Sequence, residues 1–219
     1  MNKMDDEFLK PTKYCDIDSE EISDFVKKLR CYTDIEIASA IFAFVRDGIK
    51  YRFDYPSTLA SKTMEKKSGT CFNKANLQIA LLRKAKIPAG YGVYLVRKEI
   101  LKPVLPQDIF SMVNDPTVHV FAKVFVGGKW IGLDATVDIE LFRCFYQNSG
   151  VWTHDEWNGK TDICLRGNFV LEDQGLYASI DLYLSQPPKF WTDSLIERAN
   201  AFIERKIKQK KEKNARKNN

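Results

Sequence analysis

The spacing of apolar residues predicts several amphipathic helices in the first 90 residues. Apolar side chains recur three and four positions apart over 19–31, 33–48 and 71–86, which places them on one helix face. Asp18 with Glu21, and Thr33 with Glu36, have the spacing of capping boxes, in which two side chains satisfy unpaired N–H groups at a helix start. A shorter helix is expected over 59–68.

A different pattern follows, in which short apolar segments predict strands. Residues 91–96, 118–126 and 129–134 are predicted strands, and Gly127 with Gly128 forms a hairpin turn between the last two. The segment 97–117 contains three prolines and mixed polarity, which is typical of a lid, a binding loop or a surface insertion. A further strand is predicted over 163–170. Thr192 or Asp193 begins a last helix, whose apolar face ends at about residue 207.

The charge distribution separates the end of the chain from the rest. The formal net charge is +5, but residues 205–219 hold eight Lys or Arg and one Glu. The other 204 residues hold 26 basic and 28 acidic residues. We therefore predict one domain over 1–204 and a frayed or disordered basic tail over 205–219. The charge gives little support for a nucleic-acid-binding domain. The tail is interpreted as a solvated segment, and the alternative is a weak contact of the tail with nucleic acid or an anionic membrane.

Cysteine usage and apolar runs suggest a compartment. The five cysteines include no Cys-x-x-Cys pair, which argues against a disulfide framework or a zinc ribbon. No apolar run has the length of a membrane span, and the acidic first residues do not resemble a signal peptide. We expect a cytoplasmic protein; the sequence predicts no cofactor or metal and leaves the oligomeric state open.

The stretch from Gly69 to Ala75 carries the main candidate chemistry. Thr70 is a good N-cap residue, so Cys71 is predicted to be the first residue of the helix that follows. A thiol at that position faces unpaired backbone N–H groups and the positive end of the helix dipole, both of which favour a thiolate. The other four cysteines are interpreted as small apolar residues.

The predicted hairpin supplies two partners for such a thiol. His119 starts its first strand and Asp134 ends the second, so residue 119 would pair close to residue 136, at the same end of the hairpin. A histidine can take or share the thiol proton, and a carboxylate can orient the ring and stabilise its charge. Asp138 is an alternative orienting group. A metal site formed by Cys71, His119 and Asp134 is another alternative, but it would lack a fourth ligand.

Three motifs resemble those of the transglutaminase-like superfamily. They are Gly-Thr-Cys at 69–71 with Ala-Leu-Leu-Arg-Lys-Ala-Lys-Ile-Pro-Ala at 80–89, His-Val-Phe-Ala-Lys-Val-Phe-Val at 119–126, and Trp-Ile-Gly-Leu-Asp-Ala-Thr at 130–136. Their order and spacing are those of the family, over about 35–137. Lys86, Val120, Phe121 and Ala135 depart from its usual residues, which leaves the subgroup open.

The resemblance implies a papain-like α+β fold, with helices packed on an antiparallel sheet and a catalytic cysteine at a helix N-terminus. It implies a Cys71–His119–Asp134 triad that forms a thioester, and either cleaves an amide or peptide bond or transfers the acyl group to an amine. It also implies an oxyanion-stabilising side chain upstream of the cysteine, for which Tyr51 and Tyr55 are candidates. Phe72 is a further candidate for substrate contact. A catalytically inactive binding module on the same fold is the alternative.

Overall fold

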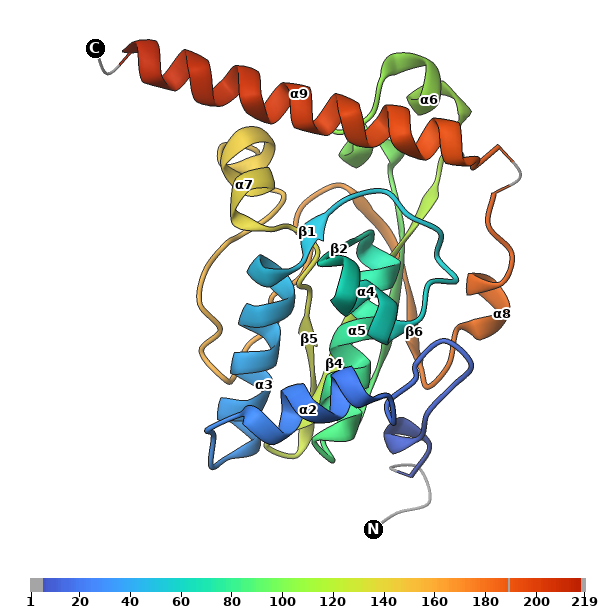
Figure 1. Cartoon of the computed structure of the whole chain (residues 1–219), viewed down its shortest axis with the longest axis vertical. Helices are drawn as coiled ribbons and strands as arrows, with labels where there is room; N and C mark the ends of the chain where they lie inside the picture. Colours follow the sequence, from blue (N-terminus) through green and yellow to red (C-terminus); the bar gives the residue numbers. More distant parts are fainter. Residues whose placement is uncertain (1–5, 189, 218–219) are drawn as a thin grey trace.

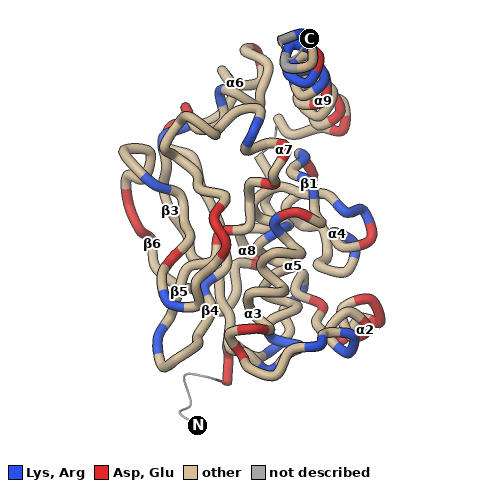
Figure 2. Tube along the Cα trace, turned by 90° about the vertical axis from the view of Figure 1, so that its left-hand side faces the viewer, with Lys and Arg blue, Asp and Glu red and all other residues tan. Residues whose placement is uncertain are grey.

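The structure, a computed structural model that describes residues 6–188 and 190–217, packs helices against one face of an antiparallel sheet (Figure 1). The sheet has the order β5 (Lys129–Leu133), β4 (Thr117–Val126), β3 (Ala89–Val96) and β6 (Val170–Tyr177). Figure 2, turned by 90°, shows the sheet and the helices as two layers. The predicted α+β class is confirmed.

Helices α5 (Cys71–Lys84) and α3 (Asp34–Ala43) pack on the inner face of the sheet, and α2 (Glu20–Lys28) and α4 (Ala60–Lys66) pack on α5. The capping box of Thr33 and Glu36 at the start of α3 is present as predicted. The one predicted for α2 is wrong by a residue, because Ser19 accepts the hydrogen bond from the Ile22 N–H. Asp18 instead forms an ion pair with Lys84 at 3.1 Å.

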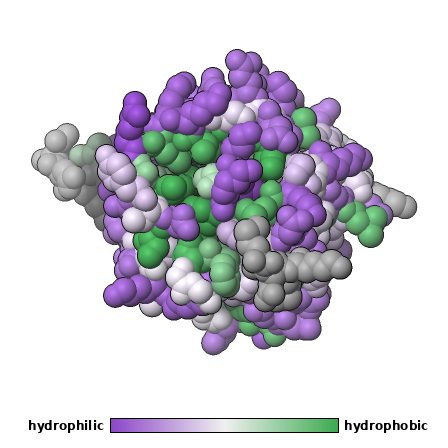
Figure 3. All heavy atoms as spheres, turned by 90° about the horizontal axis from the view of Figure 1, so that it is seen from below, coloured by the Kyte–Doolittle hydropathy of each residue, from purple (hydrophilic) through white to green (hydrophobic). Residues whose placement is uncertain are grey.

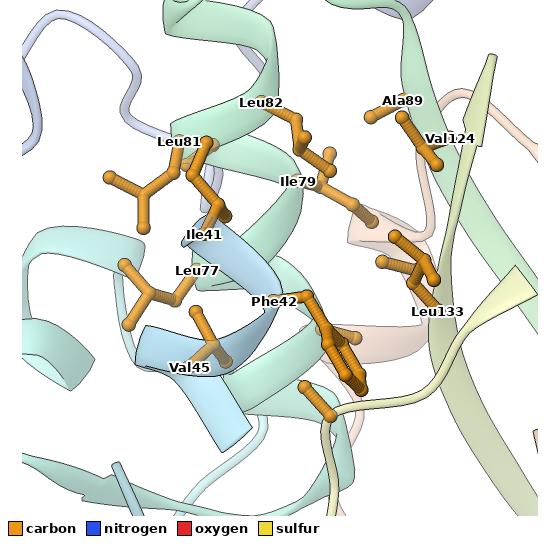
Figure 4. Packing of buried hydrophobic residues seen from close by; sticks show 14 of the residues in the cluster. Ile41, Phe42, Val45, Leu77, Ile79, Leu81, Leu82, Ala89, Val124 and Leu133 are labelled. Carbon is orange, nitrogen blue, oxygen red and sulfur yellow. The ribbon is translucent and has the colours of Figure 1, made fainter. Parts of the chain in front are cut away.

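Helix α5 is the centre of the main hydrophobic core. It lies between the other helices and strands β3 and β4, and its residues from Asn73 to Arg83 are all buried. Five of these eleven residues are polar, and Lys74, Asn76 and Arg83 are accommodated because they donate hydrogen bonds to backbone carbonyls. Figure 4 shows this packing for part of the cluster, which includes Ile41, Phe42, Val45, Leu77, Ile79, Leu81, Leu82, Ala89, Val124 and Leu133.

A second apolar cluster lies at the other end of the strands. The segment 97–117 contributes to it through two short helices, η3 (Lys98–Leu101) and α6 (Gln107–Met112). Other contributions come from α7 (Ile139–Leu141), η4 (Phe142–Tyr146) and the last helix. The segment 97–117 therefore helps to build a core in addition to covering the surface.

The remaining short elements connect these layers. They are η1 (Glu7–Leu9), the π-turn η2 (Phe44–Gly48), the strands β1 (Lys50–Tyr51) and β2 (Ser68–Gly69), and α8 (Asp181–Leu184). The strand predicted over 163–170 is wrong. Ile163 forms one isolated parallel bridge with Leu133, and Gly167 takes a left-handed φ of 82°, which interrupts an extended chain. The strand β6 begins only at Val170.

The last helix, α9 (Asp193–Lys217), is longer than predicted. The expectation of a frayed or disordered tail is wrong for the described residues up to 217, while 218–219 lie outside them. Lys, Glu, Gln, Arg and Ala dominate 208–217, and these residues have high intrinsic helix propensity, so the helix continues beyond its apolar face. Figure 2 shows the resulting concentration of Lys and Arg on α9.

Two surface properties complete the description. Figure 3 shows the end of the molecule opposite α9, where apolar side chains gather within a mostly polar border. Within the described part of the chain, none of the helices combines the length and the apolarity needed to cross a lipid bilayer.

Candidate active site

A short parallel ladder fixes the start of α5. Tyr51 of β1 pairs with Gly69 of β2, two residues before Cys71. A Cβ atom on Gly69 would lie 2.5 Å from Cβ of Asn73, so the close approach of this strand to the helix requires glycine. Asn73 Oδ1 accepts hydrogen bonds from the Thr70 N–H and hydroxyl at 2.8 and 2.6 Å. Cys71 is thus the first residue of α5, as predicted.

His119 and Asp134 meet as the hairpin register predicted. Strands β4 and β5 pair Ala122 with Leu133, and continuing this register opposes residue 119 to residue 136. His119 Nε2 lies 2.6 Å from Asp134 Oδ2, and both side chains are buried. The other carboxylate oxygen of Asp134 accepts the Thr136 N–H at 3.0 Å. The ring is therefore held through one nitrogen, which leaves Nδ1 for another partner.

The charge state of His119 follows from these contacts. Burial is the largest influence and lowers the pKa of His119, but the charge and hydrogen bond of Asp134 outweigh it, and hydrogen bonding and charge at Cys71 act in the same direction. Together they raise the pKa from 6.5 to about 10. His119 is consequently protonated at neutral pH and pairs with the Asp134 carboxylate, while Cys71 lies close enough to favour the charged ring.

Two aromatic rings restrict the movement of this imidazole. Phe121 stacks on it with ring centroids 6.0 Å apart and an interplanar angle of 14°. Trp152 meets it edge-on at 5.4 Å and 73°. Apolar rings on both sides exclude water, and a hydrogen bond is stronger in such an environment than in water. The His119–Asp134 pair is therefore oriented by packing as well as by charge.

A cavity of about 150 Å³ opens beside Cys71 and His119. Its walls come from the start of α5, the start of β4, the segment 97–117 and the chain that enters α9. The lining residues are Tyr51, Phe53, Asp54, Pro56, Thr70, Cys71, Phe72, Val96, Ile100, Leu101, Leu105, Val113, Thr117, Val118, His119, Thr136, Val137, Leu141, Tyr146, Trp152, Pro188, Phe190 and Trp191.

Tyr51 and Phe72, two of the predicted substrate-side residues, lie in this cavity wall. Tyr51 is buried, and burial together with the nearby charge of Cys71 raises the pKa of its hydroxyl, which therefore stays protonated. Asp138 Oδ2 accepts the Tyr51 N–H at 2.8 Å. This hydrogen bond to Asp138 holds the Tyr51 backbone in place beside the start of α5.

The structure places Tyr55 away from the cavity lining. Its hydroxyl donates to Asp193 Oδ1 at 3.0 Å, at the start of α9. Asp138, the alternative orienting group, accepts the N–H groups of Glu140 and Leu141 and caps α7, whereas Asp134 is the carboxylate that contacts His119. The second histidine of the chain, His154, is mostly buried and contacts Asp47 at 2.9 Å.

Sequence reasoning missed three aromatic residues near the site. Trp152 contacts His119, and Trp191 lines the cavity. Tyr183 stacks on Phe72 with centroids 5.4 Å apart, and burial and the charge of Cys71 raise the pKa of its hydroxyl. All three follow residue 137, in a region without clear periodicity. Their aromatic character was the one available signal, and it did not separate them from ordinary core residues.

Comparison with known proteins places this geometry in a family. The model of the transglutaminase-like superfamily matches residues 23–135, which include Cys71, His119 and Asp134. Among solved structures, a Cytophaga hutchinsonii protein named "putative cysteine protease" is similar, with 25% sequence identity over 62% of this chain and a TM-score of 0.48. The present chain spans 43% of that protein's chain. None of the curated proteins matches the sequence. The family match covers half of the chain, and the protein therefore belongs to the transglutaminase-like superfamily.

Proposed function

We propose that the protein is a cysteine-dependent acyl-transfer enzyme in which Cys71 is the nucleophile, His119 the acid and base, and Asp134 the orienting carboxylate. The observation that carries the proposal is the contact chain at the end of the hairpin. Asp134 holds one ring nitrogen of His119 at 2.6 Å, and His119 and Cys71 line the same cavity, close enough for Cys71 to contribute to the raised pKa of the ring. These are the roles that thiol catalysis requires.

The first half-reaction forms a thioester. The Cys71 thiolate attacks the carbonyl carbon of an amide, and a C–S bond forms as the carbonyl oxygen takes up the negative charge. The His119 imidazolium then gives its proton to the leaving nitrogen as the C–N bond breaks. A raised His119 pKa suits this step, because the ring must carry the proton before the attack.

The second half-reaction resolves the thioester. The neutral His119 takes a proton from water or from a second amine as that group attacks the carbonyl carbon. The C–S bond breaks, and the thiolate–imidazolium pair is restored. With water as acceptor the reaction is amide or peptide hydrolysis, and with an amine it is acyl transfer.

We expect two donors to stabilise the oxyanion. The backbone N–H of Cys71 is among the first in α5, and such groups have no partner within the helix. The Tyr51 hydroxyl is the second donor, because Tyr51 lines the cavity and lies close enough to Cys71 for their charges to interact. Removing one such donor typically lowers kcat by about 10²–10³-fold.

The proposal is tested by competitive alkylation. We expect limiting iodoacetamide at pH 7 to modify Cys71 well before Cys15, Cys31, Cys144 and Cys164, as followed by peptide mass mapping. Burial raises the pKa of Cys15 to about 11, and burial also raises the pKa of Cys144 and Cys164. Cys31 is partly exposed and is therefore the informative comparison.

Matched variants distinguish the proposed nucleophile from a cysteine that takes no part in the reaction. Cys71→Ala is expected to abolish turnover in a panel of peptide and amide substrates, whereas Cys31→Ala leaves it unchanged. Tyr51→Phe should lower kcat while Cys71 alkylation continues, because the hydroxyl acts on the oxyanion. If Cys71 reacted no faster than Cys31, the proposed nucleophile would be wrong, and a binding module without catalysis would replace it.

A further inference from the structure

The chemistry of the cavity beside Cys71 restricts the substrate. Of its 23 described lining residues, 17 are apolar or aromatic. Outside Cys71 and His119, Asp54 is the one charged side chain among them, and Lys66 neutralises it at 2.7 Å. Among these lining residues there is no Lys or Arg that could pair with a carboxylate or phosphate. A charged group would therefore lose its hydration here without compensation.

The size of the cavity is informative as well. A volume of about 150 Å³ is that of an apolar cavity able to hold a benzene ring. Rings of Phe53, Tyr146, Trp152 and Trp191 stand in its wall, and aromatic pairs gain energy beyond the area that they bury. A six-membered ring or a branched aliphatic group of similar size fits this space.

The walls are held in place by contacts outside the cavity. The Tyr146 hydroxyl donates to Ile100 O at 2.9 Å and so fixes η3. Arg198 of α9 pairs with Asp108 of α6 at 2.5 Å. The Trp191 Nε1–H donates to Asp54 O at 3.3 Å, which fixes the chain entering α9. An apolar group can thus enter a pocket that is largely formed beforehand, and little ordering is needed on binding.

We infer that the substrate carries an uncharged aromatic or bulky aliphatic group next to the carbonyl that Cys71 attacks. This inference rests on the proposed function, because it names the substrate class of the same site. The segment 97–117 and the residues before α9 act as specificity elements: Ile100, Leu101, Leu105, Val113, Phe190 and Trp191 contact the group, while Cys71 and His119 act on the adjacent bond.

The inference is tested with three reagents that share one leaving group. Iodoacetamide, N-benzyl-2-iodoacetamide and iodoacetate each alkylate a thiolate with loss of iodide. We expect the benzyl reagent to modify Cys71 about 10- to 100-fold faster than iodoacetamide, with saturation at high concentration, because the ring is buried in the cavity. Iodoacetate should be the slowest. The rates are measured by intact mass, and peptide mapping assigns them to Cys71.

Two neighbouring substitutions provide the matched control. Val113 lines the cavity, whereas Met112 is exposed and does not. Val113→Trp should fill the cavity, so the ratio of the benzyl rate to the iodoacetamide rate, measured on the same variant, should fall close to one. Met112→Trp should retain the advantage. Far-UV circular dichroism and a cooperative thermal transition, recorded for both variants, show that each is folded.

The outcomes separate this inference from the proposed function. Equal rates for the benzyl reagent and iodoacetamide, with Cys71 still far more reactive than Cys31, would overturn the apolar specificity and leave the nucleophile in place. A benzyl advantage that Val113→Trp leaves intact would also overturn it. Absence of selective Cys71 reactivity with any reagent would instead count against the proposed function.

Discussion

Replacing Asp134 by Asn tests the electrostatics of the site directly. The two side chains have nearly the same shape, and Asn can still occupy the position 2.6 Å from His119 Nε2. The change removes the negative charge that opposes the effect of burial on His119. It therefore separates the charge of Asp134 from its packing, which a change to Ala would not do.

The expected size of the effect follows from the pKa of His119. Its rise from 6.5 to about 10 corresponds to on the order of 5 kcal/mol of preference for the charged ring, at ~1.4 kcal/mol per pH unit. An opposite charge at hydrogen-bonding distance typically accounts for about 1–3 pH units. In Asp134→Asn, burial still lowers the pKa of His119. We therefore expect the pH at the midpoint of the His119 titration to fall by at least about 1–3 units.

Nuclear magnetic resonance of ¹⁵N-labelled histidine measures this midpoint directly. The chain contains two histidines, and a His154→Gln variant identifies the remaining signal as that of His119. In the parent protein the His119 ring should stay charged up to pH 9 and titrate at about 10. In Asp134→Asn it should titrate at clearly lower pH.

The same change has a consequence for stability, with a definite sign. A pKa raised in the folded state stabilises the fold fully below pH 6.5, and this stabilisation is lost as the pH rises through about 10. The difference in unfolding free energy between parent and Asp134→Asn should thus shrink between pH 6 and pH 10. A parent midpoint near 6.5, or one that Asp134→Asn leaves unchanged, would refute the charge pairing of His119 with Asp134.

Three further predictions concern the buried side chains of α5. Burial lowers the pKa of Lys74 to about 7. Because the unfolded chain binds more protons than the folded protein between pH 7 and 10.5, the unfolding free energy of the parent should rise with pH relative to that of Lys74→Met. Urea titrations at several pH values measure this difference, and a difference that does not change with pH would contradict the prediction. Arg83 donates to three backbone carbonyls. Arg83→Lys should therefore lower the unfolding free energy by about 1–3 kcal/mol or more, because carbonyls are left unpaired. In the same urea assay the control Arg166→Lys, which changes an exposed residue, should leave the unfolding free energy nearly unchanged. Leu77→Ala should lower the unfolding free energy by about 2–5 kcal/mol, because Leu77 is fully buried. Calorimetry should show a lower Tm for this variant than for Leu182→Ala, which changes an exposed residue. Equal Tm values would show that the core relaxes around the change.

Local patterns in the sequence were sufficient for helices α2 to α5 and for the hairpin. The spacing of apolar residues and the Thr33–Glu36 box predicted α3, and the apolar run after Thr70 predicted α5. Two glycines defined the turn between β4 and β5. Because a hairpin has a fixed register once its turn is known, the sequence also predicted that His119 and Asp134 lie close together. These features depend on contacts between neighbours in the chain, which a linear pattern records.

Tertiary packing decided the rest of the site. The sequence offered Tyr51 and Tyr55 as equal candidates, and the parallel pairing of Tyr51 with Gly69, together with the Asp138 carboxylate, placed Tyr51 beside Cys71. Tyr55 instead contacts the start of α9. No periodicity distinguishes two tyrosines four residues apart, since their positions depend on partners more than ten residues away in the chain.

The cavity wall is likewise a property of the folded chain. Trp152 and Trp191 come from irregular segments that approach Cys71 only after the sheet, the segment 97–117 and α9 have packed together. The sequence by itself therefore predicted the positions of the proposed reacting groups, through a helix start and a hairpin. Only the tertiary structure decided what surrounds them, because burial and the pairing of distant segments set the shape and polarity of the cavity.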